Sequence, residues 1–246
     1  MTEISHLRRR MIEDMTVRNL SPATQRSYVH AVAKLGRFFG RSPERLAQAR
    51  DRLGRPTALN TIAADAANED EVERLFAAIG ELTHIVSTAV DAGGAYALLP
   101  DLDMSSARRV IDSKLIAALL LAKHGAPRLS RSGSITLTSG IAAYRPAPRG
   151  SAVAAVNGAL ESLVYALAIE LAPVRVNAIS PGWVDTEIWE SLAGERKTAV
   201  LDGMAKRLPV GRVGRPDDIA QAIVATARNG FISGTVVHVD GGQRLV

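Results

Sequence analysis

The stretch VRVNAISPG, residues 174–182, decides the fold class, because it predicts a strand directly after a helix expected over about 152–171. The same alternation extends outward in both directions. Expected strands are TALNTIAAD (57–65), LTHIVSTA (82–89), GSITLTSG (133–140) and TVVHVD (235–240), and further helices are expected over 70–80, 105–124 and 216–228. Repeated strand–helix units predict an α/β fold, a parallel sheet with helices on both faces.

Length and composition narrow the possible classes of protein. A chain of 246 residues suffices for one large α/β domain, or for a domain with an appendage. The sequence has no cysteine, which excludes disulfides, thiolate chemistry and a cysteine metal site, and we expect no metal. No segment predicts a signal peptide or a membrane span, so we expect a cytoplasmic protein without membrane contact.

The positive charge lies at the front of the chain. Residues 1–55 hold 12 Lys and Arg against 5 Asp and Glu, whereas residues 56–246 hold 18 against 20, so the front carries the net charge of +5. A basic segment suits an acidic partner such as nucleic acid. It equally suits a solvated arginine-rich helix face, and charge alone leaves both interpretations open.

Two styles of sequence meet near residue 40. Residues 2–39 predict two helices, separated within NLSPATQRSY (19–28), where Ser21 is a suitable N-cap and Pro22 suits the first helical position. Apolar residues recur at helical spacing on both of them: Leu7, Met11, Met15, Tyr28, Val32, Leu35 and Phe39. We therefore expect a basic helical segment over 1–40 and an α/β domain over 41–246.

From about Gly40 to Val246 the chain resembles the short-chain dehydrogenase/reductase family. The matching motifs, which follow the family's order and spacing, are GRSPERL (40–46), AADAANEDEVERLF (63–76), GSITLTSG (133–140), LAPVRVNAISPGWVDT (171–186), GRVGRPDDIAQAI (211–223) and GTVVHVDGG (234–242). Each motif is weak by itself, and together they are specific. The resemblance implies a Rossmann-like sheet with a nicotinamide cofactor across the carboxyl ends of the strands.

The resemblance also implies which residues contact the cofactor. Arg41 matches an arginine that meets the 2′-phosphate of NADP, for which a forked guanidinium is suited, and this favours NADP over NAD. Asp65 matches a carboxylate that accepts from the adenine amino group, and Ala89 falls near the adenosine ribose. Ordinary loop and helix-start polarity is the alternative for Arg41 and Asp65. The loop that holds the nicotinamide amide and pyrophosphate falls on Pro181, Gly182, Val184 and Thr186.

The family's catalytic pair is absent. Its Tyr-x-x-x-Lys falls on Val153 and Asn157, which offer neither a phenol proton nor a charge, so that proton transfer cannot run unchanged. Ser139 matches the serine that bonds the substrate oxygen. Lys114 stands at the position of the active-site asparagine and could return a cation, while Tyr144 could supply a phenol. The candidate catalytic residues are thus Ser139, Lys114, Tyr144 and Asn157; the alternative is a lysine with a buried stem and a loop tyrosine.

The family's first strand and its glycine-rich turn are missing, and a short helical segment stands in their place. Residues 1–35 contain no glycine, so no backbone cradle for a pyrophosphate can be built there. STAV (87–90) replaces Asn-Asn-Ala-Gly, and because Val90 resists positive φ we expect a different or strained turn. We expect the front helices to cover the freed edge of LTHIVSTA poorly, or TALNTIAAD to pair with it.

The front of the chain, LRRRMIEDMTVRNLSPATQRSYVHAVAKLGRFFGRSPERL (7–46), resembles the N-terminal helical, DNA-contacting region of tyrosine recombinases and integrases, over about residues 1–45. We find no counterpart of that family's catalytic Arg, His and Tyr. DNA binding would rest on phosphate contacts and fall steeply with salt. The arginines concerned are Arg8, Arg9, Arg10, Arg18, Arg26 and Arg37.

Three functions are compatible with these observations. The leading interpretation is an NAD(P)-dependent oxidoreductase for a small alcohol or carbonyl substrate, with altered or impaired catalysis and residues 187–207 as a substrate lid. Trp183, Trp189 and Met204 offer apolar contacts there, or serve plain helix packing. The second is a non-catalytic Rossmann-like binding or scaffold protein, and the third is a DNA-binding protein. The resemblance also implies a homodimer or homotetramer through helices 105–124 and 152–171, with contacts such as Leu119, Leu120, Leu163 and Leu167.

Overall fold

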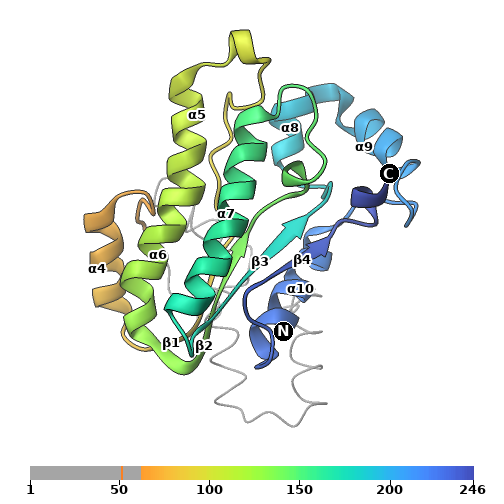
Figure 1. The fold of residues 1–246 in the computed structure, drawn as a ribbon. Coiled ribbons are helices and arrows are strands. Elements are labelled where there is room, and N and C mark those ends of the chain that lie inside the picture. The colour runs from red at the N-terminus through yellow and green to blue at the C-terminus, as the bar shows by residue number, and fades with distance from the viewer. Residues whose placement is uncertain (1–50, 52–61) are drawn as a thin grey trace.

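The computed structural model describes residue 51 and residues 62–246, and this part of the chain contains a four-stranded parallel sheet. Its strands are β1 (Leu82–Ser87), β2 (Leu129–Thr138), β3 (Arg175–Pro181) and β4 (Thr235–Val239), and they lie side by side in that order. Every pairing is parallel, so the carboxyl ends of all the strands meet at one end of the sheet (Figure 1). The predicted α/β fold with a Rossmann-like parallel sheet is confirmed.

Helices cover both faces of this sheet. On one face lie α6 (Ala117–Gly125) and α7 (Ser151–Glu170), with α4 (Glu69–Ile79) packed against α6, and on the other lies α10 (Pro216–Arg228) (Figure 1). The helix α5 (Met104–Ile111) runs through a π-helical turn (Asp112–Ile116) into α6, and both α5 and this turn contact α7. Two short helices, α8 (Ile188–Ala193) and α9 (Lys197–Ala205), follow β3 beyond the carboxyl ends of the strands.

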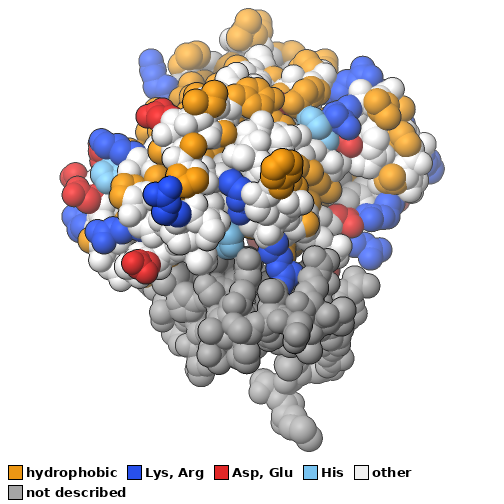
Figure 2. All heavy atoms as spheres, turned by 60° about the horizontal axis from the view of Figure 1, so that its bottom comes forward, with side chains coloured by type: hydrophobic (Ala, Val, Ile, Leu, Met, Phe, Trp, Pro, Cys, Tyr) orange, Lys and Arg blue, Asp and Glu red, His pale blue; other side chains and the backbone are white. Residues whose placement is uncertain are grey.

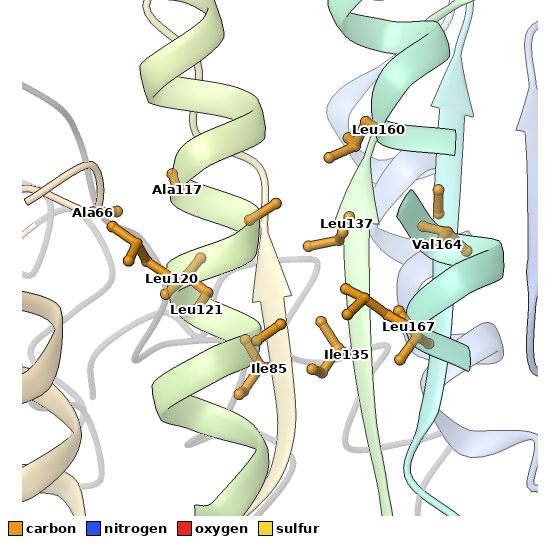
Figure 3. Close-up of a cluster of buried hydrophobic side chains, with 14 of the residues drawn as sticks. Ala66, Ile85, Ala117, Leu120, Leu121, Ile135, Leu137, Leu160, Val164 and Leu167 are labelled. Atoms are coloured by element: carbon orange, nitrogen blue, oxygen red, sulfur yellow. The ribbon is translucent and has the colours of Figure 1, made fainter. Parts of the chain in front are cut away.

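The largest hydrophobic core holds α6 and α7 on the sheet (Figure 3). Ile85 of β1 and Ile135 and Leu137 of β2 pack in one cluster with Leu160 and Val164 of α7, and each of these side chains is at most 1% exposed. Burying a side chain of this size contributes about 1.5–3 kcal/mol. The cluster therefore fixes the position of α7 and, with it, of the polar side chains that α7 carries.

The helix α7 is long and apolar enough, by length and composition, to cross a membrane. In this structure its apolar residues have another role, because Val156, Leu160 and Val164 are buried in the core. Two polar residues one turn apart, Asn157 and Glu161, are also buried on this helix. Packing against the sheet accounts for the apolar residues on one side of α7, while Tyr165 and Ile169 of the same helix are exposed.

Strand register aligns three polar residues at the carboxyl end of the sheet. Thr138 pairs with Ile179, so Ser139 comes level with Ser180, and Ser180 itself pairs with His238. Side chains alternate between the faces of a strand. Because Ile179 packs on the α10 side, its neighbour Ser180 points toward α7. The same face therefore carries a polar row from three adjacent strands.

The described residues also correct several expectations. Residues 62–65 of TALNTIAAD precede a turn and are in no strand. The rest of that segment lies outside the described residues, and so do residues 1–50, which include Arg41. Val90 needs no positive φ, because Arg149 is the only non-glycine residue with positive φ in the described part. Leu120 and Leu167 are 8% and 7% exposed and belong to the core, since they face the sheet and not outward.

Candidate active site

A lysine and an asparagine meet at the carboxyl end of the sheet. Lys114 lies in the π-helical turn between α5 and α6, and Asn157 lies in the second turn of α7. The Lys114 ammonium donates a hydrogen bond to Asn157 Oδ1 and another, of 3.0 Å, to the backbone carbonyl of Ser139. A π-helical turn shifts the register of a helix, and such turns are frequent at functional sites. The structure thus brings together three of the predicted catalytic residues.

The charge of Lys114 is sensitive to its surroundings. Burial of the ammonium lowers the pKa of Lys114 to about 8, and the negative charge of Glu161 opposes that shift. An amine with a pKa near neutrality can give up and take back a proton at physiological pH. Lys114 therefore has the protonation behaviour that a general acid requires.

The Ser139 hydroxyl points into the protein. Its Oγ donates to Glu161 Oε1 at 2.6 Å and lies 3.3 Å from the backbone carbonyl of Asn157, and the residue is 3% exposed. A hydroxyl has one proton to donate. In this conformation that proton is directed at Glu161, so the role of Ser139 as a donor to the substrate oxygen stays a prediction.

Tyr144 contacts the other oxygen of the same carboxylate. It follows the 3₁₀ turn Ile141–Ala143, and its phenol donates to Glu161 Oε2. The ring of His238, on β4, packs edge-on against the Tyr144 ring with the centroids 4.6 Å apart. Burial and the adjacent Glu161 carboxylate raise the pKa of Tyr144 well above its ordinary value, so this phenol holds its proton. Its direct part in proton transfer stays a prediction.

Sequence reasoning missed Glu161. It is 7% exposed, and both of its carboxylate oxygens accept hydroxyl hydrogen bonds. Its spacing could have indicated it: Glu161 follows Asn157 by four residues, which puts the two side chains on one face of α7. Such a carboxylate is seldom buried without partners. We refer to Lys114, Ser139, Tyr144, Asn157 and Glu161 as the carboxyl-end cluster.

The position of the family's catalytic tyrosine is a packing position in this chain. Val153 is 6% exposed and packs with Ala95, Val110 and Val156. Nearby, Gly140 allows a close approach, because a Cβ there would lie 2.9 Å from Asn157 Nδ2. Position 153 therefore offers no proton donor in place of that tyrosine.

The loop after β3 holds four predicted cofactor residues. Pro181 ends β3, and a Cβ on Gly182 would lie 2.7 Å from the Cα of Asp240, so only glycine fits this close approach to the end of β4. Val184 forms a bridge with Gly214, and its carbonyl accepts from Trp189 Nε1 at 2.8 Å. Thr186 follows in the same loop.

The lid that follows is tied to this loop. The Trp183 and Trp189 rings pack against each other at a tilt, with their centroids 4.4 Å apart, and Lys197 forms a 3.0 Å ion pair with Asp185. These contacts connect α8 and α9 to the end of β3. Residues 187–207 are therefore a folded pair of short helices beside the carboxyl ends of the strands, which suits the predicted lid.

The remaining predicted cofactor residues lie on the α4 side of the sheet. Asp65 is exposed just before the turn that precedes α4, where its Oδ1 accepts from the Ala67 N–H at 2.9 Å and its N–H donates to Glu71 Oε2 at 2.7 Å. Ala89 lies two residues beyond the end of β1. The structure thus places Asp65 and Ala89 in loops on either side of α4 and β1, and their contacts to adenosine stay predictions.

The chemistry at the strand ends fits the nicotinamide part of a dinucleotide. Ser180 Oγ and Thr138 Oγ1 are buried hydroxyls that find no hydrogen-bond partner among the described residues. Unpaired buried hydroxyls are costly and are often satisfied by a ligand or water. They lie at the ends of β2 and β3, where doubly wound sheets bind ligands. Residues 1–35, which stand where the family has its glycine-rich pyrophosphate turn, lie outside the described residues.

Comparison with known proteins agrees with this architecture. Residues 38–244 match the family model described as enoyl-(acyl carrier protein) reductase. The chain belongs to the short-chain dehydrogenase/reductase family. Residues 7–50 match a second model, the N-terminal SAM-like domain of phage integrases, as the resemblance of the front segment predicted.

Curated relatives cover much of this chain. It is 40% identical over 171 residues to the short-chain dehydrogenase/reductase ucsE of an Acremonium species, covering 67% of this chain and 63% of ucsE. It is 32% identical over 195 residues to cis-4-hydroxycyclohexanecarboxylate dehydrogenase of Sinomonas cyclohexanicum, covering 75% and 76% of the two chains. The chain thus spans less than two thirds of ucsE.

Solved structures give the same result. A small-chain dehydrogenase in complex with NADPH is 36% identical, has a TM-score of 0.71, and is matched over 82% of this chain and 94% of its own. The MalC reductase/Diels–Alderase of Malbranchea aurantiaca is 29% identical, with a TM-score of 0.75 over 83% and 85% of the two chains.

Proposed function

We propose that this protein is an oxidoreductase that uses a nicotinamide cofactor on a small carbonyl or alcohol substrate, with Lys114 as its proton-transferring group. The observation that carries the proposal is the contact between Lys114 and Asn157. In the family pattern the cation comes from α7 and the amide from the neighbouring helix; here the two residue types have exchanged places. The exchange keeps a cation and an amide together at the strand ends.

The proton chemistry follows from the position of Lys114. When bound, the cofactor supplies a hydride to the carbonyl carbon in the reducing direction. The substrate oxygen then gains negative charge and takes a proton from the Lys114 ammonium, which becomes a neutral amine and is reprotonated from solvent. The Ser139 carbonyl and Asn157 Oδ1 orient the ammonium throughout.

The cofactor would lie across the strand ends. Val184 and Thr186, in the loop after β3, would hold the nicotinamide amide, and Asp65 and Ala89 would lie at the adenosine end. NADP is favoured because Arg41 offers a guanidinium for a 2′-phosphate. The solved relative with NADPH supports a nicotinamide cofactor for this chain.

The substrate would lie under the lid. The Trp183–Trp189 pair, which joins the loop after β3 to α8, would offer it an apolar surface, and Met204 on α9 would add to that surface. An apolar surface beside one cationic group suits a small, largely apolar ketone or aldehyde.

Binding and turnover can be measured on the full chain. NADPH is titrated while its fluorescence is followed, and a panel of small ketones and aldehydes is then screened for loss of NADPH absorbance. Saturable binding with carbonyl-dependent loss supports the proposal. Saturable binding with no loss for any compound supports a binding or scaffold protein instead. Absence of saturable binding at millimolar NADPH contradicts the proposal.

The scaffold function is a second candidate, because two observations favour it. Val153 is a packed core residue, and the Ser139 proton is directed at Glu161. A site of this kind can bind a ligand without turning it over. The screen described above separates the two candidates at the catalytic step.

DNA binding would have to come from the front segment. The described range 62–246 carries 18 basic and 20 acidic residues, because positions 56–61 are uncharged. On the face shown in Figure 2, Lys and Arg side chains are interspersed with acidic and hydrophobic ones. A gel-shift assay on the full chain at low and moderate salt tests this function, and no shift at low salt contradicts it.

Self-association is proposed on the outer side of α6 and α7. Three apolar side chains are exposed there: Leu119 by 41%, Tyr165 by 50% and Ile169 by 82%. Exposed apolar side chains that lie together favour contact with another protein surface, here a second copy of this chain. Light scattering combined with size-exclusion chromatography measures the oligomeric state, and a monomer at all concentrations contradicts the proposal.

A further inference from the structure

Glu161 is a buried carboxylate that the family pattern does not explain. It lies in the middle of α7 between core residues Leu160 and Val164, and it is 7% exposed. Removing a carboxylate from water is unfavourable unless hydrogen bonds and an opposite charge compensate it. The structure supplies both kinds of compensation.

The Glu161 carboxylate accepts hydrogen bonds from two segments that pack beside α7. Ser139, at the end of β2, donates to Oε1 at 2.6 Å, and Tyr144, after the 3₁₀ turn, donates to Oε2. Each oxygen of the carboxylate therefore holds one hydroxyl in a defined direction. The Tyr144 ring is in turn held by the ring of His238.

The opposite charge is the ammonium of Lys114. Ser139 lies between it and Glu161 and forms a hydrogen bond with each. The ammonium donates to the Ser139 backbone carbonyl at 3.0 Å, while the Ser139 hydroxyl donates to the carboxylate. The electrostatic interaction between Lys114 and Glu161 acts through a protein interior, where charges are screened less than in water.

We propose that Glu161 is the positioning residue of this site: its carboxylate orients Ser139 and Tyr144 and is the counter-charge that keeps Lys114 protonated. The role of Glu161 in catalysis rests on the proposed function, but its effect on the protonation of Lys114 can be measured without turnover. Glu161 acts through Lys114 and does not itself touch the substrate.

Three titratable groups interact electrostatically with Glu161, namely Lys114, Tyr144 and His238, and three more act on Tyr144 or His238. Burial, helped by Arg244, lowers the pKa of His238, so this ring is neutral near pH 7 and Lys114 is the cation joined to Glu161 through Ser139. The groups to be considered are Lys114 from the π-helical turn, Tyr144 after the 3₁₀ turn, Tyr165 on α7, His238 on β4, and Asp240 and Arg244 beyond β4.

The test is a direct titration of Lys114. The chain has five lysines, so ¹³C-labelled lysine side chains give a small set of NMR signals, of which Lys114→Met identifies one. In Glu161→Gln, which keeps the shape and an acceptor but removes the charge, we expect the Lys114 titration to move down by about one pH unit or more. Where turnover is measurable, its loss at high pH should move down by the same amount.

Two matched variants separate charge from packing. Glu170→Gln removes an exposed carboxylate at the end of the same helix and should leave the Lys114 titration unchanged. Glu161→Asp keeps the charge and should restore most of the Lys114 pKa. An unchanged Lys114 titration in a folded Glu161→Gln protein overturns the inference, whether or not the wild type turns over a carbonyl.

A second measurement needs no substitution at Glu161. With ¹³C-labelled glutamate carboxyls, one signal of the wild-type protein should respond at the pH where Lys114 titrates, and that response should vanish in Lys114→Met. A glutamate spectrum with no such response also overturns the inference. This measurement decides the question even where Glu161→Gln fails to fold.

Discussion

Two buried polar clusters lie at opposite ends of the sheet, and they are built differently. The amino-end cluster consists of His84, Ser134 and Arg175, which the strand register places side by side on β1, β2 and β3. The carboxyl-end cluster lies under α7 on the other face. Both clusters contain a cation buried among hydrogen-bond partners, but the cations bind different kinds of group.

The amino-end cluster joins the sheet to the end of a helix. The Arg175 guanidinium donates to the carbonyls of Thr226 and Ala227 in the last turn of α10 and to those of Asn229 and Ile232 beyond it, at 2.7–3.2 Å. The last carbonyls of a helix have no partner within it and attract cations. His84 Nδ1 lies 2.8 Å from Ser134 Oγ. These contacts tie elements together.

The carboxyl-end cluster contains groups that can exchange protons. Lys114 has a pKa of about 8, and it faces a carboxylate through the Ser139 hydroxyl. The Ser180 hydroxyl, which has no hydrogen-bond partner among the described residues, lies at the same strand ends and on the same face. The comparison teaches that burial of a cation does not define its role. An arginine saturated by backbone carbonyls supports the fold, whereas a lysine with a lowered pKa on the same face as an unpaired hydroxyl suits chemistry.

The largest effect is expected at Lys114. Lys114→Met keeps a similar length but removes the ammonium, so turnover should fall by about 10²–10⁴-fold, the usual contribution of a general acid, with NADPH binding retained. Lys123→Met, on the exposed side of α6, is the matched control and should turn over normally. Steady-state kinetics with a responsive carbonyl measures both, and equal rates in the two variants would remove Lys114 from the mechanism.

A large effect on stability is expected at Arg175. Arg175→Met leaves four carbonyls, two of them buried and two partly buried, without their donor, and the free energy of unfolding should fall by about 4 kcal/mol. Urea denaturation followed by circular dichroism measures the change. Arg131→Met, at an exposed position of β2, should change it little. If the molecules that remain folded also lost turnover, the division of roles between the clusters would be wrong.

A smaller, pH-dependent effect is expected at His84. Burial, helped by the charge of Arg175, lowers the pKa of His84 to about 4 from 6.5. Between these values the unfolded chain binds a proton that the folded chain does not, so the free energy of unfolding decreases as the pH falls from 6.5 toward 4, by up to about 3 kcal/mol. Denaturation at several pH values measures this, and His84→Gln should flatten that part of the profile. An equally steep profile in His84→Gln would assign the dependence to other groups.

Much of the fold was predictable because it follows from local patterns. Strands such as LTHIVSTA and VRVNAISPG were found at nearly their observed bounds, β1 (Leu82–Ser87) and β3 (Arg175–Pro181). The prediction went wrong where side-chain direction mattered, since Leu120 and Leu167 were expected in an oligomer contact and lie in the core. Helix periodicity identifies an apolar face but does not say what covers it.

The site was predictable only in part. Lys114 and Asn157 could be named from their places in the motif pattern, and their mutual contact could not. Glu161 was not predicted as a site residue, because a glutamate in a helix is ordinarily exposed. Only the packing of α7 onto β2, with the turn that carries Tyr144, gives this carboxylate two hydroxyl partners.

By itself, the sequence determined the order of strands and helices, the parallel sheet, the family, and the absence of that family's tyrosine and lysine from α7, because these depend on residue type and spacing along the chain. The tertiary structure decided which polar groups share one interior. It placed Lys114 against Asn157, directed Ser139 and Tyr144 at Glu161, and saturated Arg175 with the carbonyls at the end of α10. The physical reason is that burial and electrostatic coupling arise between residues distant in the chain, and packing alone brings them within reach.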